Sequence, residues 1–122
     1  MSRTDDLNNA LSKLQASSAD IEACAVVSED GLIIASSLPQ GLEENHIAAM
    51  SAAMLSMGSR TAAELKRGEL QQIFVKGENG YAIIMHAGPY AALLAMARKD
   101  AKLGLIFLDL SRAAEEVKNL LS

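Results

Sequence analysis

The segment that covers residues 81–87 restricts the possible folds most, because it is apolar on both of its alternating faces. Side chains along a strand point to opposite faces in turn, which places Ile83 and Met85 on one face and Ala82 and Ile84 on the other. Such a strand is stable only where protein covers both faces of its sheet. We therefore expect a layered domain in which helices cover the sheet on two sides.

The rest of the chain contains enough helical and strand patterns to build these layers. A first helix is predicted where Leu7, Ala10, Leu11 and Leu14 recur at helical spacing behind Thr4, which can cap it. Strand patterns cover residues 21–27, 32–37, 70–76, 81–87 and 90–98, and helical patterns run from about residue 43 to 67 and from about residue 102 onward. The order is helix, two strands, helix, three strands, helix.

Glycine-containing turns separate neighbouring strands and favour antiparallel pairing. The turns are Ser28-Glu29-Asp30-Gly31, the Gly-Glu-Asn-Gly sequence at residues 77–80, and Gly88-Pro89. The predicted fold class is therefore α/β in the α+β sense, with one five-stranded antiparallel sheet, the long middle helix on one face and the two terminal helices on the other. A chain of 122 residues is expected to form a single domain, over residues 1–122.

The composition argues against several classes of partner and location. The net charge is -4 and no run of Lys and Arg exceeds two residues, so we expect no nucleic-acid binding. No apolar run approaches the roughly 20 residues of a membrane span, and Arg3, Asp5 and Asp6 argue against a signal peptide. We expect a soluble, cytoplasmic protein with no direct membrane insertion.

The sequence contains no catalytic or cofactor-binding pattern. It lacks the G-x-x-x-x-G-K-[ST] and G-x-G-x-x-G signatures of nucleotide-binding loops. His46 and His86 do not have the spacing of a metal-binding pair, and the single cysteine, Cys24, falls in a strand with no base assigned to it. We therefore expect no enzyme activity, no cofactor and no metal site.

The middle helix carries little charge around its circumference. One stripe, expected to face the sheet, consists of Ile47, Met50, Met54, Met57, Thr61 and Leu65. The alternative for its methionines is an adaptable binding surface, which we rank behind core packing. The opposite side consists mainly of Ala49, Ala52, Ala53, Ser56 and Ala63, with Arg60 among them. A helix face with so few charges is typical of a surface that binds another protein. The alternative is that alanine, the best helix former, simply occupies a solvated face.

Three segments of the sequence form a specific combination. They are Ala-Val-Val-Ser-Glu-Asp-Gly-Leu-Ile-Ile-Ala-Ser at residues 25–36, Leu-Lys-Arg-Gly-Glu-Leu at residues 65–70, and Lys-Leu-Gly-Leu-Ile at residues 102–106. Together they resemble the roadblock/dynein light chain family, and in particular its gliding-motility GTPase-regulator type. The resemblance extends from about residue 7 to residue 121 and implies a profilin-like roadblock architecture.

The resemblance also implies a homodimer that works on GTPases. In such a dimer the strand at residues 70–76 pairs with its copy to continue the sheet, and the middle helices pack as a pair. The family regulates or scaffolds Ras-like small GTPases, and its gliding-motility members stimulate the GTPase of a partner. The predicted dimer and partner interface consists of Ala49, Ala52, Ala53, Ser56, Arg60, Ala63, Leu70, Gln72, Phe74 and Lys76.

The expected function is therefore that of a non-enzymatic homodimeric regulator or scaffold, which binds a Ras-like small GTPase and modulates its nucleotide cycle. We expect Arg60 to help position the partner rather than to act as an arginine finger, because a helix backed by a sheet is a rigid platform. One alternative is a passive adaptor subunit that binds without regard to nucleotide state. Another, ranked behind it, is a small-molecule sensor or enzyme with a pocket between sheet and helix.

Overall fold

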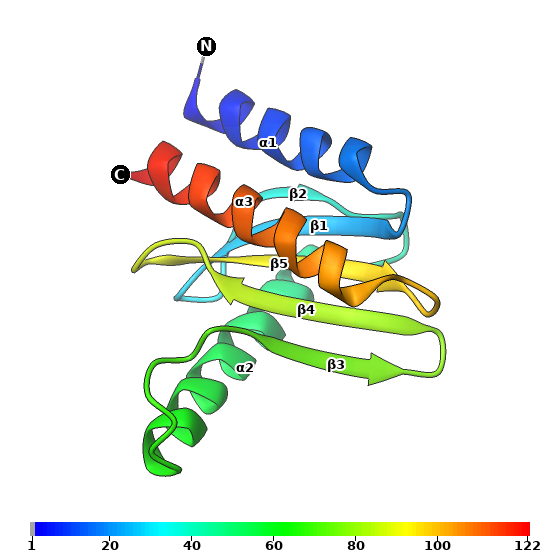
Figure 1. Ribbon diagram of the computed structural model, residues 1–122. Helices are drawn as coiled ribbons and strands as arrows, with labels where there is room; N and C mark the ends of the chain where they lie inside the picture. The colour runs from blue at the N-terminus through cyan, green and yellow to red at the C-terminus, as the bar shows by residue number, and fades with distance from the viewer. Residues whose placement is uncertain (1) are drawn as a thin grey trace.

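The computed structural model describes residues 2–122, which form three helices and five strands (Figure 1). In chain order these are α1 (Arg3–Ser17), β1 (Ile21–Ser28), β2 (Ile33–Ser37), α2 (Glu44–Glu64), β3 (Ile73–Gly77), β4 (Gly80–His86), β5 (Ala91–Arg98) and α3 (Leu103–Leu121). The predicted type and order of these elements are confirmed.

The five strands form one antiparallel sheet in the order β2-β1-β5-β4-β3. Three hairpins join strands that are neighbours in the sheet, and the pairing of β1 with β5 joins the first hairpin to the other three strands. β2 and β3 are the two edges of the sheet. The predicted five-stranded antiparallel sheet is therefore confirmed.

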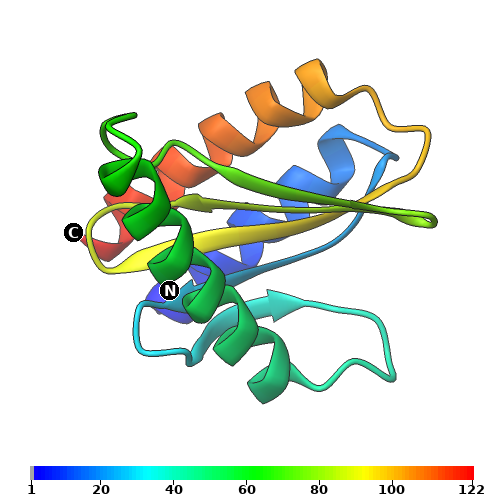
Figure 2. The ribbon, with the colours of Figure 1, turned by 90° about the horizontal axis from the view of Figure 1, so that it is seen from below.

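Helices cover both faces of this sheet (Figure 2). α1 and α3 pack side by side on one face, over a buried cluster that includes Val26, Ile83 and Leu93. α2 covers the other face, where Ile84 and Leu94 belong to a second buried cluster. The two faces of β4 are both apolar because each lies beneath a helical layer. The predicted layers are confirmed.

The turn between β1 and β2 packs directly against α2. Gly31 in this turn has a φ of +85°, in the left-handed region that favours glycine, and its N–H donates to the carbonyl oxygen of Ser28 at 3.0 Å. A Cβ atom on Gly31 would contact the Cα atom of Ala49 at 3.4 Å. Small residues on both sides thus allow the hairpin and the helix to touch, and the predicted tight turn is confirmed.

Three element boundaries differ from the predicted ones by more than one residue. Ser2 caps α1 instead of Thr4, because the Oγ atom of Ser2 accepts a hydrogen bond from the N–H of Asp5 at 3.1 Å. β3 begins at Ile73 rather than at residue 70, since the preceding residues carry the chain from α2 to the sheet. α2 ends at Glu64 rather than near residue 67.

Lys66 ends α2 in a conformation that is unusual for lysine, with a φ of +58°. The N–H of Arg67 donates to the carbonyl oxygen of Ala62 at 2.7 Å, and the N–H of Lys66 donates to that of Ala63 at 3.1 Å. These two bonds make a Schellman cap, in which the left-handed position is usually glycine. The cap explains why the helix stops before the predicted residue.

Replacing Lys66 with glycine is expected to stabilise the domain. A side chain in the left-handed conformation costs roughly 1–2 kcal/mol, part of which the greater freedom of glycine in the unfolded chain offsets. The free energy of unfolding, measured by urea denaturation, is expected to rise by about 0.5–1 kcal/mol. The matched control is Gly68→Ala, at a φ of +87°, which is expected to lower it. Loss of stability in Lys66→Gly would contradict the expectation.

Candidate protein-binding surface on α2 and β3

α2 faces the sheet with a different stripe from the predicted one. Its buried residues are Ala48, Ser51 and Leu55, whereas Met50 is half-exposed and Met57 is 62% exposed. The observed stripe is offset from the predicted one by one residue, or roughly 100° around the helix. The prediction that the methionine stripe faces the sheet is therefore wrong for Met50 and Met57, whereas Ile47 and Met54 of the same stripe pack against the core. The small side chains of Ala48 and Ser51 allow a closer approach to the sheet than methionine would.

The methionine stripe instead follows the side of α2 that lies next to β3. Met54 packs at the margin of the core, and Thr61 and Leu65 are exposed. Leu65 is 63% exposed although leucine is usually buried. This side of the helix is therefore an apolar surface with no covering element among residues 2–122.

The C-terminal end of α2 extends beyond the edge strand β3 (Figure 1). The helix crosses the strands at an angle, from the β1–β2 turn near Ala49 to the β3 edge (Figure 2). α2 comes closest to β3 at Gly58, where a Cβ atom would lie 2.5 Å from the Cδ1 atom of Ile73. After Gly58 most side chains are exposed, including those of Arg60 and Leu65. The described chain places no strand beneath these last turns of α2.

β3 presents an open edge with exposed apolar side chains. Phe74 is 50% exposed and Val75 is similarly exposed. The ring of Phe74 packs against Phe107 of α3, with centroids 6.1 Å apart, and the Nζ atom of Lys76 lies 6.0 Å from the ring centroid of Tyr81. An edge strand with unpaired backbone groups and apolar side chains is able to pair with another strand.

A groove of about 550 Å³ lies between the methionine side of α2 and β3. Its lining is mostly apolar and consists of Met54, Met57, Gly58, Thr61, Ala62, Leu65, Arg67, Leu70, Gln72, Ile73 and Phe74. We call this groove and the open edge of β3 the α2–β3 surface. It is the candidate functional site of the molecule.

The predicted interface residues lie in two places. Leu70, Gln72 and Phe74 line the groove, and Lys76 follows on β3. Exposed positions on α2 hold Ala49, Ala53, Ser56, Arg60 and Ala63, while Ala52 is partly buried near Gly31.

Several residues of the α2–β3 surface are absent from the predicted interface, and among them are the exposed apolar side chains of Met57, Leu65 and Val75. The sequence pattern assigns Met57 and Leu65 to the side of the helix that faces the sheet. Helical spacing alone does not distinguish a side that faces the sheet from one that faces a partner.

Arg60 lies on the solvent side of α2, where its Nε atom is 3.8 Å from the Oε1 atom of Glu64. The two side chains are one helical turn apart, and more than two thirds of each is exposed. An exposed pair of this kind adds little to stability. Arg60 is thus free to contact a protein that docks on this side of α2.

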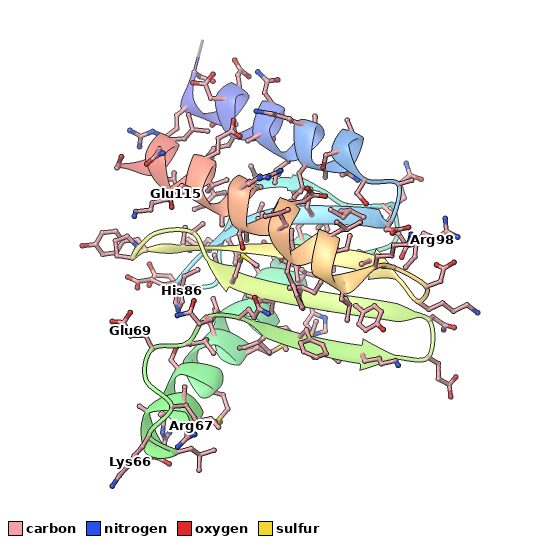
Figure 3. The ribbon with its side chains drawn as sticks, viewed as in Figure 1. Lys66, Arg67, Glu69, His86, Arg98 and Glu115 are labelled. Carbon is pink, nitrogen blue, oxygen red and sulfur yellow. The ribbon has the colours of Figure 1, made fainter. Side chains whose placement is uncertain are left out.

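Polar hollows occupy the other flank of α2, near the β4–β5 turn. One, of about 320 Å³, is lined by Glu29, Asp30, Ser56, Ser59 and His86 together with apolar residues. Figure 3 shows the neighbouring side chains, with His86 at the end of β4, Glu69 in the loop between α2 and β3, and Glu115 on α3. The space between α2 and the sheet is filled by residues such as Leu55 and Ile84. The hollow of about 320 Å³ therefore lies between α2 and the β1–β2 and β4–β5 turns, at one end of the sheet.

Cys24 lies in the core and is not suited to nucleophilic chemistry. Its side chain is fully buried, and burial raises the pKa of the thiol to about 11. Its Sγ atom donates to the carbonyl oxygen of Leu11 at 3.7 Å. Within residues 2–122, no three His, Cys, Asp or Glu side chains gather in a way that could hold a metal ion. The described helices also include none with the length and apolar character needed to cross a membrane.

The chain is similar to archaeal proteins over most of its length. The protein MJ1340 of Methanocaldococcus jannaschii is 38% identical over 98 residues, which are 80% of this chain and 85% of the relative. MJ1340 is itself described as uncharacterized. This relative therefore supports descent from a common ancestor and does not assign an activity.

Two solved structures share the fold. Gliding protein MglB from Thermus thermophilus superposes with a TM-score of 0.88 at 18% identity, over 98% of this chain and 91% of MglB. LokiProfilin1, solved in complex with rabbit actin, superposes with a TM-score of 0.68 at 14% identity, over 98% of each chain. These likenesses confirm the roadblock and profilin-like architecture. The family model for the Roadblock/LC7 domain matches residues 7–97, and the protein belongs to that family.

Proposed function

We propose that the chain acts in the cytoplasm as a homodimer that binds a Ras-like small GTPase, and that it regulates or scaffolds this partner without catalysing a reaction itself. Membership of the Roadblock/LC7 family and the likeness of the fold to MglB support a regulatory role of this type.

The observation that carries this proposal is the uncovered α2–β3 surface. The last turns of α2 extend past β3, and the groove beneath them exposes Met57 and Leu65. A second copy whose β3 pairs with this β3 would continue the sheet under these turns and cover the groove. Removing apolar side chains from water in this way favours association.

The same arrangement would place two α2 helices on one face of a continuous sheet. The solvent sides of these helices, with Ala53, Ser56, Arg60 and Ala63, would then form a platform of small side chains. A flat surface with few charges allows a second protein to approach the helix backbones closely. We assign this platform to the GTPase.

Arg60→Ala is expected to change any stimulation of GTP hydrolysis by less than roughly tenfold, because Arg60 serves as a contact on the platform. Loss of an arginine finger would reduce the rate by about 10³–10⁵-fold. Single-turnover hydrolysis by the partner, at saturating amounts of this protein, distinguishes the two. Glu64→Ala is the matched control, since it removes the same ion pair and keeps the arginine. A thousandfold loss in Arg60→Ala alone would assign the finger role.

Light scattering of the pure protein, alone and with a candidate Ras-like GTPase, tests the proposed function. The GTPase is loaded with GDP in one sample and with a non-hydrolysable GTP analogue in the other. We expect a dimer that captures the GTP-analogue form preferentially. Equal capture of both forms would support a passive adaptor instead, and a monomer would contradict the homodimer.

A further inference from the structure

Alternate residues of β3 direct their backbone N–H and C=O groups to the open edge of the sheet. The N–H of Ala87 donates to the carbonyl oxygen of Ala91 at 2.9 Å, so odd-numbered residues of β4 direct their backbone groups to β5. The even-numbered residues of β4 consequently bond to β3, where their partners are Ile73, Val75 and Gly77. Phe74 and Lys76 therefore direct their N–H and C=O groups outward, away from β4. Gln72 lies two residues before Phe74, so its backbone groups point the same way.

Few symmetric pairings of two such edges satisfy these backbone groups. In an antiparallel pair related by a twofold axis, one residue lies opposite its own copy, and outward-directed residues must face one another. An axis at Lys76 would place two ammonium groups opposite each other, which is unfavourable. An axis at Ile73 would leave Val75 and Lys76 without strand partners, because the residues opposite them in the second copy precede β3. Only axes at Phe74 and Val75 remain.

We infer that two copies of this chain pair through β3 with Phe74 opposite Phe74 of the second copy; this rests on the proposed homodimer and specifies its register. On the α2 side, Val75 then faces Ile73 of the second copy, so that one apolar side chain covers another. On the α3 side, Lys76 faces Gln72 of the second copy. The axis at Val75 would instead place Ile73 opposite Gly77, which has no side chain to cover it.

The aromatic residues of the chain support the same register. It contains two phenylalanines and no tryptophan, and both phenylalanines lie at this edge, with ring centroids 6.1 Å apart. Phe74 is half-exposed and covers Phe107 on one side only. An axis at Phe74 brings four rings together, two from each copy, and aromatic rings pair favourably at such distances. The exposed half of Phe74 is then buried by its copy.

Variants with one added cysteine distinguish the two registers by disulfide formation. Residues opposite each other in a hydrogen-bonded pair have Cα atoms about 5.5 Å apart, inside the disulfide range, whereas diagonal neighbours lie about 7–8 Å apart and outside it. After mild oxidation, non-reducing gels are expected to show at least roughly tenfold more linked dimer for Phe74→Cys than for Val75→Cys. The parent chain is the control, because its fully buried Cys24 does not react.

A second measurement keeps both phenylalanines in place. Ile73→Cys and Val75→Cys chains are unfolded together, refolded as a mixture and oxidised. The inferred register places these two cysteines in a non-hydrogen-bonded pair, with Cα atoms about 4.5 Å apart, so the mixture is expected to form a linked heterodimer. Neither chain alone is expected to link.

The outcomes separate the register from the dimer itself. Stronger linking of Val75→Cys alone than of Phe74→Cys or of the mixture would overturn the inferred register and support the axis at Val75. A dimer by light scattering in which no variant links would overturn pairing through β3 and leave the homodimer intact. A monomer at all concentrations would overturn the proposed homodimer, and the register with it.

Discussion

The Phe74→Glu variant is expected to be a monomer at concentrations where the parent chain is a dimer. The substitution removes an aromatic contact and places two carboxylates opposite each other at the centre of the inferred interface. Together these changes are expected to cost about 3 kcal/mol or more, which weakens the dimer by at least roughly 100-fold. Sedimentation equilibrium over a range of protein concentrations measures the dissociation constant.

Tyr90→Glu is the matched control for this prediction. Tyr90 is also an exposed aromatic residue, but it lies in the β4–β5 turn, away from β3. The control is expected to dimerise like the parent chain, and circular dichroism should show that both variants are folded. A folded Phe74→Glu variant with unchanged affinity would exclude the α2–β3 surface as the dimer interface.

Leu93→Ala is expected to be the most destabilising single change in the core. Leu93 is 0% exposed, in the central strand β5, on the face that α1 and α3 cover. Truncation removes buried apolar volume and leaves a cavity that the rigid sheet does not fill, which costs about 2–5 kcal/mol. Urea denaturation at one fixed protein concentration measures the loss, since dimer formation also contributes to apparent stability.

Leu105→Ala on α3 provides the comparison, because the side chain of Leu105 is 59% exposed. The loss there is expected to stay below about 1 kcal/mol, as is usual for surface positions. Similar losses at the two positions would mean that the cluster between the sheet and the terminal helices contributes less than its burial indicates.

The layers of the fold were predictable from local patterns. Alternating apolar residues in β4 require cover on both faces, and the three helical segments supply it. Gly31 was recognisable as a turn residue because its left-handed φ is one that glycine adopts without strain. The end of α2 was not recognisable, because Lys66 occupies a cap position where glycine is usual.

The candidate site was only partly predictable. The resemblance pointed to the third strand, and Phe74 and Lys76 lie on the open edge of β3. The low charge of the middle helix correctly indicated exposed small residues such as Ala53 and Ala63. The exposure of Met57 was not predicted, because an apolar side chain at helical spacing is equally typical of the core.

The sequence by itself determined the type and order of the helices and strands and which side chains share a face, because these depend on local spacing and turn chemistry. The tertiary structure decided which face of α2 meets the sheet. Ala48 and Ser51 pack there because small side chains let the helix approach, and the resulting crossing angle leaves the C-terminal end of α2 beyond β3. Contacts between distant segments set this angle, and helical periodicity alone does not specify it.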